Sequence, residues 1–562
     1  MVQTVQGLNL ESQFTTVKIS LEGDNIGDIT TILDKIVTFH PLFIKEYSIS
    51  PTLLTIRSKL PFLWRESAES FVNLSKSKIT LEKAQQYVIE EVIGRRIKSM
   101  STIPVLESAH NQNIETTPAV LDDLMIKDLK QGYRRIFNRY YLLGCGKGSQ
   151  ITGSIASSKD AYISQNLQRD KWSTNTMIKR LNLPLPKWEV IDSLNHLEEV
   201  FSEYEKPVVI KPTGLTGGHG VVVGINTLEE AKKAFKFAKE AGEGKATWQT
   251  KVMIQEQVQG EDYRLLVING KLEIATKRIP AFIIGDGKLT IKELIEKENK
   301  DPRRDTTNPA HILKPIDIDE PLKDYIKEQG LTLSSVPSKE EKIQVRKIAS
   351  MSQGGITEDF TDSVSKEIKT IVESLANSLH AFTLGVDVMC LDLSKPLTKE
   401  NGAILEVNTM PESYLNFYPI LGKQRSYVAE TYIKALLKEN VCKKFVVIGQ
   451  SKDDLPTLLR RKWMIKKEDT VGEIVQERYY INGMLMNEQS QRWRSFESIK
   501  CNALLDVIVI HHRDWDDVKE YGLGFDHINT VFITKDMSTN KEYMKILKRY
   551  KRMKLIDNIR KI

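Results

Sequence analysis

The sequence predicts an α/β protein of several domains. Short apolar runs rich in β-branched residues, typical of buried strands, alternate along the chain with longer stretches typical of helices. At 562 residues the chain can hold roughly three to four domains of ordinary size. Charged residues at 28% and hydrophobic residues at 40% are the balance of a soluble globular protein, which excludes a disordered chain.

Residues 1–160 mix both kinds of element. Strand-like pieces lie at residues 15–19 and 53–56, and a helical stretch runs from Leu81 to Lys98. No catalytic motif can be derived from this region, so it is predicted to be an α/β domain without chemistry of its own.

A glycine-rich hairpin follows the strand predicted at residues 207–212. Glycine backbone can approach phosphate oxygens closely, and Lys211 supplies a point charge for phosphate. The spacing of a P-loop is absent, and a mobile surface turn would have the same composition. His219 could touch phosphate or stand idle at the loop tip. The glycines of the hairpin are Gly214, Gly217, Gly218 and Gly220.

The next predicted element is a strand over residues 252–264 that carries hydrogen-bond acceptors and leads to Arg264. Backbone groups of such a strand could hydrogen-bond an adenine edge, and Glu261 could reach a ribose. The backbone positions concerned are Glu256, Gln257 and Val258.

Two later apolar runs, residues 385–388 and 402–408, place oxygen-bearing side chains inside predicted strands. Glu406 and Asn408 are two residues apart and leave the same face, and Asp387 can reach that face from a neighbouring strand. Carboxylate and amide oxygens suit Mg²⁺ together with nucleotide phosphate. The alternative is an Asp that caps a turn and a Glu-x-Asn that faces solvent.

The order of these motifs resembles that of ATP-grasp ligases, and more narrowly that of the cyanophycin synthetases. The resemblance extends over roughly residues 140 to 435. Its matching segments are residues 263–267, 277–281, 285–287, 290–291, 301–304, 329–333, 335–337, 354–355 and the run that ends at Asn408.

The resemblance implies an ATP-grasp domain over residues 161–435 that uses ATP and Mg²⁺. It makes Lys171 a nucleotide-binding lysine, although a lysine that opens a helix is usually only solvated. Lys211 and Arg264 become the catalytic groups, and Asp387, Glu406 and Asn408 the metal ligands. The implied reaction is ligation of a carboxylate and an amine through an acyl phosphate.

The same resemblance gives residues 1–160 a role in acceptor binding or oligomerisation, because residues 141–150 are similar to the segment that leads into the ligase module. Asp160 departs from the neutral residue usual in the family. It is therefore a candidate subsite for a basic substrate side chain.

The third region, residues 443–562, resembles a Mur-type ligase module. The strand at residues 445–448 remains, but Asp453 stands where a phosphate loop needs a hydroxyl, and Asp454 would repel phosphate. We therefore expect this region to be a truncated, non-catalytic Mur-ligase-like remnant.

Because the ATP-grasp module is expected to be active and the Mur-like module inactive, the resemblance implies a shorter synthetase of the family. Such an enzyme extends a cyanophycin-like polymer from β-aspartyl-arginine dipeptides on a peptide primer. Two alternatives stay open. The chain could be a stand-alone ATP-grasp ligase that joins another amino acid or dipeptide to a peptide or small carboxylate, or it could be a non-catalytic scaffold.

Charge and cysteine usage indicate which partners and which cellular compartment to expect. The net charge of +7 comes from residues 541–562, so no nucleic-acid partner is expected. The tail from Lys545 to Arg560 is predicted to be a basic amphipathic helix that either is solvated or attracts an acidic partner. Four scattered cysteines, no signal segment and no long apolar run favour a cytoplasmic protein without a membrane contact. Relatives suggest a homo-oligomer, either a dimer or a tetramer.

Overall fold

The computed structural model describes residues 2–97, 102–119, 140–215, 218–244, 250–409, 411, 414–449, 465–488 and 492–562. The chain divides into two compact units. Unit 1 comprises Met1–Ser157, Asn308–Ala310 and Ile433–Ile562, and unit 2 comprises Ser158–Thr307 and His311–Tyr432. The domain boundaries expected from the sequence stay predictions.

Unit 2 contains an antiparallel four-stranded sheet in the order β11-β10-β12-β9. Helix α10 begins at a capping box in which Thr227 and Glu230 bond each other's backbone N–H groups, and it packs Ala234 and Phe235 into the core of this sheet. The elements are β9 (Trp188–Ile191), α9 (Leu194–Phe201), β10 (Val208–Pro212), β11 (Val222–Ile225), α10 (Leu228–Ala241) and β12 (Val252–Glu256).

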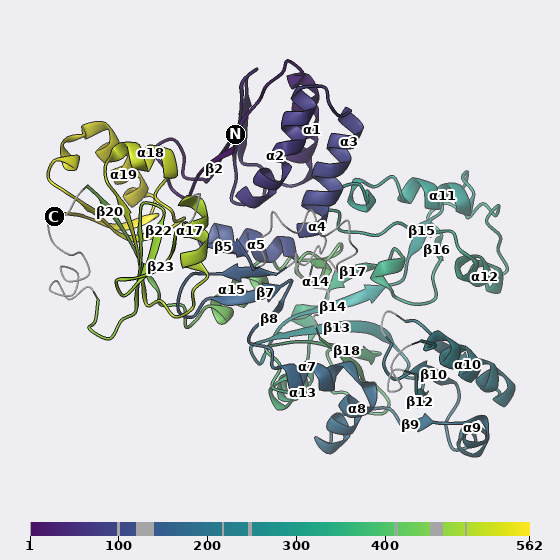
Figure 1. Cartoon of the computed structure of the whole chain (residues 1–562). Helices are drawn as coiled ribbons and strands as arrows, with labels where there is room; N and C mark the ends of the chain where they lie inside the picture. The colour runs from purple at the N-terminus through teal and green to yellow at the C-terminus, as the bar shows by residue number, and fades with distance from the viewer. Residues whose placement is uncertain are drawn as a thin grey trace. The chain divides into compact units, whose positions relative to one another are not determined.

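A second, five-stranded antiparallel sheet of unit 2 has the order β17-β14-β13-β18-β19 (Figure 1). Leu375 of α13 and Ile178 of α8 are buried in the core that contains Leu265, Val386 and Ile404 of this sheet. The elements are α7 (Tyr162–Arg169), α8 (Lys171–Arg180), β13 (Glu261–Ile268), β14 (Lys271–Ile279), β17 (Ile356–Asp359), α13 (Lys366–Ser378), β18 (Thr383–Cys390), β19 (Gly402–Asn408) and α14 (Tyr414–Phe417).

The single strand expected over residues 252–264 is wrong. It is two strands, β12 and β13, and they belong to different sheets. The chain breaks at Gly260, whose φ is +125° and where a Cβ atom would lie 2.2 Å from the carbonyl carbon of Cys390. Only glycine tolerates this backbone and this close approach, so the strand cannot continue through residue 260.

The polar stretch from Asp286 to Ser350 is a folded insertion. It has a small core of its own around Ile283, Ile291 and Ile326. Its elements are α11 (Ile291–Glu298), α12 (Glu320–Glu328) and β16 (Lys342–Gln344), and β16 pairs with β15 (Phe282–Ile284), which precedes the stretch. The stretch is therefore folded and is not a linker.

The N-terminal part of unit 1 is an antiparallel sheet, β1-β2-β4-β3, covered by helices, followed by a second small sheet, β5-β6-β7-β8. The predicted strands near residues 15–19 and 53–56 are confirmed, as is helical structure from Leu81 through Arg96. The elements are β1 (Val2–Val5), β2 (Thr16–Ser20), α1 (Ile26–Phe39), β3 (Glu46–Ile49), β4 (Leu53–Arg57), α2 (Pro61–Ser75), α3 (Leu81–Gln86), a π-helical segment (Tyr87–Ile93), α4 (Gly94–Arg96), α5 (Thr102–Asn111), β5 (Thr116–Pro118), β6 (Tyr141–Leu143), β7 (Gln150–Gly153) and β8 (Ala156–Ser157).

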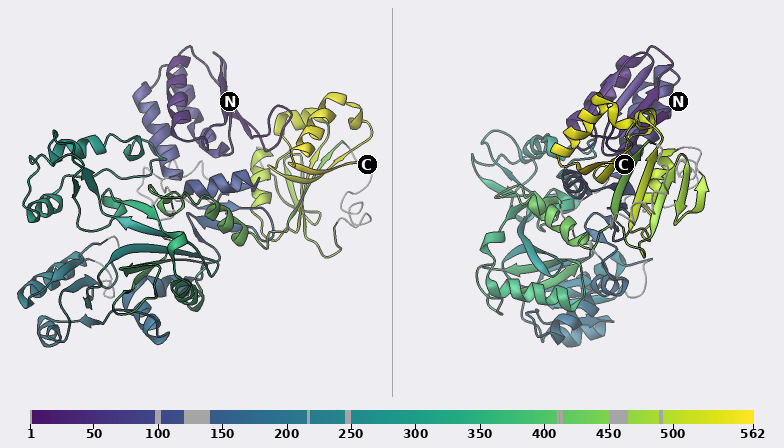
Figure 2. Two further views of the ribbon diagram at one scale, coloured as in Figure 1. Left: turned by 180° about the vertical axis from the view of Figure 1, so that it is seen from behind. Right: turned by 90° about the vertical axis from the view of Figure 1, so that its left-hand side faces the viewer.

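The C-terminal part of unit 1 is a seven-stranded sheet in the order β23-β22-β21-β24-β20-β25-β26, whose strands lie side by side in both views of Figure 2. Strands β21, β24, β20, β25 and β26 run parallel to one another, whereas β22 is antiparallel to both β21 and β23. Helix α15 (Tyr427–Leu436) begins in unit 2 and ends in unit 1. The elements that follow it are β20 (Lys443–Ile448), β21 (Val471–Val475), β22 (Arg478–Ile481), β23 (Met484–Glu488), α17 (Arg492–Lys500), β24 (Val507–His512), α18 (Trp515–Tyr521), β25 (Ile528–Ile533), α19 (Lys541–Arg552) and β26 (Ile556–Lys561).

The expected basic helix from Lys545 to Arg560 is wrong in its extent. Helix α19 ends at Arg552, and the chain then forms β26 parallel to β25. Lys554 adopts φ +59°, and the N–H of Leu555 donates to the Tyr550 carbonyl at 3.0 Å. This left-handed C-terminal turn stops the helix before Leu555.

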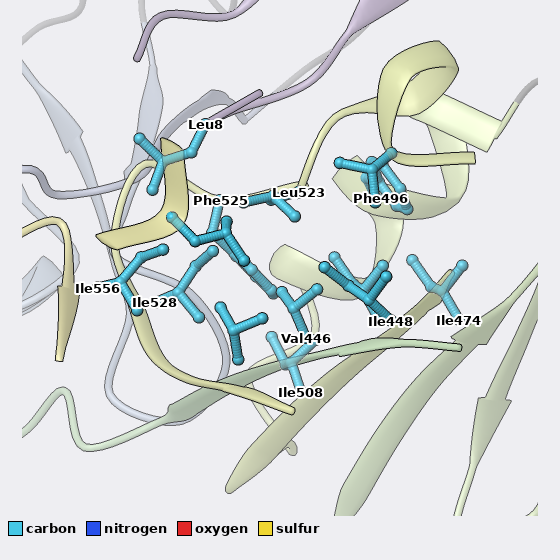
Figure 3. Packing of buried hydrophobic residues seen from close by; sticks show 14 of the residues in the cluster. Leu8, Val446, Ile448, Ile474, Phe496, Ile508, Leu523, Phe525, Ile528 and Ile556 are labelled. Atoms are coloured by element: carbon cyan, nitrogen blue, oxygen red, sulfur yellow. The ribbon is translucent and has the colours of Figure 1, made fainter. Parts of the chain in front are cut away.

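One core joins the two ends of unit 1. Leu8, from the purple N-terminal segment, lies against the cluster of Leu523 and Phe525 in Figure 3, and Ile556 belongs to the same core. The N–H of Leu8 donates to the Phe525 carbonyl at 2.8 Å. Within the described ranges, no helix is both long and apolar enough to cross a membrane.

Candidate active site

The predicted metal ligands lie in one row across the five-stranded sheet of unit 2. Asp387 on β18 stands opposite Arg264 on β13 on one side and opposite Glu406 on β19 on the other. Asn408 leaves the same face of β19 as Glu406, because side chains alternate along a strand. The structure therefore brings Arg264, Asp387, Glu406 and Asn408 together.

Asp387 is the centre of this row. Its side chain is 3% exposed, and Arg264 contacts both of its oxygens, with Nη2 at 3.2 Å from Oδ2. The Asn408 amide nitrogen donates to the same Oδ2 at 3.1 Å. A buried carboxylate needs such partners, because an unpaired charge in the interior is costly.

Arg278 on β14 is a site residue that the sequence reasoning missed. Its Nη2 lies 3.1 Å from Asp387 Oδ2 and 2.6 Å from Asp262 Oδ1. Asp262 stands directly across from Arg278 in the β13–β14 ladder. Burial and the nearby Asp387 raise the pKa of Asp262 against the pull of Arg278. The signal was present in the sequence, since Arg278 lies in one of the segments that carry the resemblance, but no spacing rule gave it a role.

Lys171 connects the sheet to the glycine-rich hairpin. Asp170 caps the N-terminus of α8 by accepting from the N–H groups of Trp172 and Ser173, which fixes the position of Lys171 at the helix start. The Lys171 ammonium lies 3.3 Å from Glu406 Oε2 and donates to the Leu215 carbonyl at 2.7 Å. One lysine thus contacts both the metal-ligand row and the hairpin.

Lys211 is buried at the end of β10, with 7% of its surface exposed. Burial lowers its pKa to about 8, although Glu406 acts in the opposite direction. Burial alone would raise the pKa of Glu406, but Lys171 and Lys211, with Arg278 and Arg264, hold it at about 2. Glu406 is therefore ionised at neutral pH, and its side chain remains 30% exposed.

The hairpin between β10 and β11 is only partly described. Gly217 lies outside the described residues, Gly214 is buried, and Gly218 and His219 are exposed. Gly220 has φ +73°, and a Cβ atom there would meet Pro212 and Ala241. Glycine at position 220 thus allows the close turn back into β11.

The predicted adenine-binding residues lie where β12 ends. The N–H of Glu256 donates to the Lys187 carbonyl at 2.9 Å, and that of Gln257 to the Pro207 carbonyl at 3.2 Å. Because these two N–H groups are already bonded, an adenine contact at Glu256 or Gln257 would have to use another group of the residue. Val258, the third predicted residue, follows them directly in the sequence. Glu261 at the start of β13 pairs with Lys277 at 3.0 Å.

Asp160 has a structural role at the start of β18. Its Oδ1 accepts from the N–H groups of Phe382 and Thr383, each at 3.1 Å, where β18 begins. Both bonds use the same oxygen, and the acidic substrate subsite at Asp160 stays a prediction.

The donor set fits a magnesium ion. Two carboxylates and one amide converge on one face, Glu406 is ionised and partly exposed, and Mg²⁺ usually takes one or two carboxylates and completes its shell with phosphate and water. Among the described residues no group of three or more His, Cys, Asp and Glu could hold a metal by itself. A separate cavity of about 350 Å³ near β15 and β17 is lined by none of the predicted site residues.

Comparison with known proteins agrees with this arrangement. The family model for the ATP-grasp (A) domain of phosphoribosylglycinamide synthetase matches residues 169–278, which include Lys171, Lys211 and Arg264. Cyanophycin synthetase of a Synechocystis strain is 35% identical over 288 residues, which are 51% of this chain and 32% of that protein. About half of the chain is similar to the cyanophycin synthetases. The match covers about a third of the length of these cyanophycin synthetases.

Two further matches are to proteins named for glutathione synthesis. The glutathione biosynthesis bifunctional protein GshAB of Clostridium perfringens is 28% identical over 310 residues, 54% of this chain and 39% of that protein. A bifunctional glutathione synthetase structure from Pasteurella multocida aligns with 66% of this chain and 47% of its own, at 24% identity and a TM-score of 0.46. The similarity to the cyanophycin synthetases rests on the sequence matches.

Proposed function

We propose that this protein is an ATP-dependent peptide ligase that extends a cyanophycin-like polymer. The single observation that carries the proposal is the group of four cationic side chains around Asp387 and Glu406. These cations are Lys171, Lys211, Arg264 and Arg278. Phosphoryl transfer depends on positioning and on neutralising charge, and a cluster of this kind supplies both.

In the proposed reaction the γ-phosphoryl group of ATP passes to the α-carboxylate at the end of the acceptor, and ADP leaves. The amine of the incoming unit then attacks the acyl phosphate, and phosphate leaves as the amide forms. Lys171 and Lys211 would neutralise phosphate oxygens, and Arg264 with Arg278 would stabilise the acyl phosphate and the tetrahedral oxyanion. No side-chain nucleophile is required.

Asp387, Glu406 and Asn408 would hold Mg²⁺. The ion would neutralise charge on the β- and γ-phosphates when bound. The two arginines that contact Asp387 hold its carboxylate in place beside Glu406, so that the ligand set is organised before nucleotide arrives.

The substrate that we propose is a ready-made β-aspartyl-arginine dipeptide, added to a peptide primer. Support comes from the relatives named cyanophycin synthetase and from the sequence of the third region, where Asp453 and Asp454 replace the groups of a phosphate loop. Residues 450–464, which include Lys452, lie outside the described residues. A single acyl-phosphate site activates one kind of carboxylate, so a second, side-chain amide would not be made. We place this reaction in the cytoplasm, in a homo-oligomer.

The test is ADP release with a short primer and three donors: β-aspartyl-arginine, free aspartate plus arginine, and other β-linked dipeptides. We expect ADP and a longer polymer, identified by its mass, with the dipeptide alone. Polymer from free aspartate and arginine would refute the dipeptide proposal. Turnover only with another amine would favour the second candidate, a ligase for a different amino acid or dipeptide, to which the match with GshAB proteins also points.

A further inference from the structure

Helix α19 carries a straight row of exposed cations on the outside of unit 1. Lys541, Lys545, Lys548 and Arg552 follow one another at intervals of four, three and four residues, so they share one face of the helix. Together with Lys551 they line a shallow hollow of about 600 Å³. The row spans about 16 Å at 1.5 Å per residue.

The helix is held rigidly from its other side. Met544, Leu547 and Tyr550 are buried in the core of unit 1, and the Tyr550 hydroxyl donates to the Asn9 carbonyl at 2.6 Å. The apolar face of α19 is therefore occupied. The helix cannot insert that face into a membrane, so only the charged face is available to a partner.

The row is not neutralised by the protein itself. In the part of the chain that the structure describes, no carboxylate oxygen lies within 4.0 Å of any of these five side chains. Residues 541–562 contain nine Lys or Arg and two acids, and nine minus two gives +7, the formal net charge of the whole chain. Like charges three and four residues apart destabilise a helix, and an acidic partner would remove this repulsion.

The chemistry of the row indicates the kind of partner. None of the five residues that line the hollow is apolar, so this face lacks the aromatic or aliphatic anchors around which a folded protein interface is built. Successive cations are about 4.5–6 Å apart along the helix. Alternate residues of an extended chain are about 6.6–6.8 Å apart, which is somewhat longer, and the long flexible side chain of lysine can make up the difference.

We propose that this face of α19 binds an extended acidic polypeptide segment with Asp or Glu at alternate positions. Binding is electrostatic, and it weakens as salt screens the charges. The inference does not depend on the proposed ligase activity, because binding is measured without ATP or ligase substrates.

The test is fluorescence anisotropy of the full chain with a labelled sixteen-residue (Glu-Ser) repeat peptide. A (Gln-Ser) repeat of the same length is the neutral comparison. We expect the acidic peptide alone to bind, and its affinity to fall about tenfold or more when ionic strength rises from about 50 to about 300 mM. Equal binding of the neutral peptide would overturn the proposal.

The decisive variant is Lys545→Glu with Lys548→Glu, which reverses two charges of the row and should weaken binding at least about tenfold. The matched control is Lys233→Glu with Lys236→Glu, an exposed pair with the same three-residue spacing on α10, which should bind like the original chain. Circular dichroism would verify that both variants fold. Unchanged binding by the α19 variant would overturn the proposal. Tighter binding of single-stranded DNA or of anionic vesicles than of the acidic peptide would overturn the choice of partner.

Discussion

Each unit of this molecule contains a cluster of buried charges, and the two clusters differ in what remains accessible. In unit 1, Glu115 accepts from Lys500 at 2.9 Å, lies 3.6 Å from Lys444 and also accepts the N–H of Asp526 at 2.7 Å, and the side chains of Glu115 and Lys500 are each 4% exposed. In unit 2, Glu406 stays 30% exposed beside Lys171. A sealed cluster holds chain segments together, whereas an open one can exchange its partners for a substrate. A charge cluster therefore supports the proposal of an active site only where part of it stays accessible, as Glu406 does.

The largest effect should come from the open cluster. We expect Glu406→Gln with Asn408→Ala to reduce ATP turnover about a thousandfold or more, because it removes two oxygen ligands for Mg²⁺. Turnover would be measured by ADP release over a titration of Mg²⁺, and the unfolding midpoint should stay close to that of the original chain. Near-normal turnover at saturating Mg²⁺ would contradict the metal assignment.

The sealed cluster should instead control stability. We expect Glu115→Gln to lower the free energy of unfolding by about 3–5 kcal/mol, because Lys500 and Lys444 lose their buried counter-charge. Denaturant unfolding measures the change. Glu198→Gln, which breaks the exposed pair with Lys232 at 2.7 Å, is the matched control and should cost less than about 1 kcal/mol. Equal losses in both variants would remove the distinction between sealed and exposed pairs.

Glu115 should also make the stability of the protein depend on pH, with a loss of stability at low pH. Burial would raise the pKa of Glu115, but Lys500 and Lys444 lower it from 4.5 to about 2. The stabilisation from Glu115 is therefore complete above pH 4.5 and is lost as pH falls toward about 2. The loss of stability over this range, followed by thermal unfolding, should be smaller in Glu115→Gln than in the original chain.

A third, smaller effect tests the residue that the sequence reasoning missed. Arg278→Lys keeps the charge but cannot contact Asp262 and Asp387 in the same way, so we expect turnover to fall about ten- to a hundredfold. Arg425 bridges Asp359 at 2.7 Å and Asp362 at 2.9 Å outside the cluster, which makes Arg425→Lys the matched control. Similar turnover in the two variants would mean that Arg278 does not contribute to the reaction.

The smallest effect is expected at the predicted inactive loop. Lys452→Ala should leave turnover within about twofold of the original, whereas a working phosphate loop depends on its lysine. If this change stopped incorporation of one substrate while ATP-grasp activity persisted, the third region would be a second active module and the dipeptide proposal would fall.

Local patterns predicted the strands of the site well. Strand β19 has the expected bounds, Gly402–Asn408, and the two-residue spacing of Glu406 and Asn408 places them on one face whatever the rest of the fold does. The convergence of Asp387 with Glu406 needed only that β18 and β19 be neighbours, which a short connection favours.

Local sequence patterns could not predict which residues of separate strands stand opposite one another. Arg278 reaches Asp262 and Asp387 because β14 and β18 flank β13, and a bulge between Leu266 and Val267 shifts the β13–β14 register. The end of α19 was missed because Lys554 is not glycine, although it adopts the left-handed conformation that glycine usually supplies. The break at Gly260 between β12 and β13 depends on contact with Cys390, 130 residues away in the sequence.

The shared core of Leu8 and Ile556 sets an order of events during synthesis. Unit 2 is built almost entirely from the uninterrupted middle of the chain, and it can fold as soon as that stretch has left the ribosome. Leu8 can pack only when Phe525 and Ile556 have been made. At a synthesis rate of about 5–20 residues per second, these residues appear roughly half a minute to two minutes after Leu8. During this interval the N-terminal segment lacks its final partners, so it is the part of the nascent chain that most needs protection from aggregation.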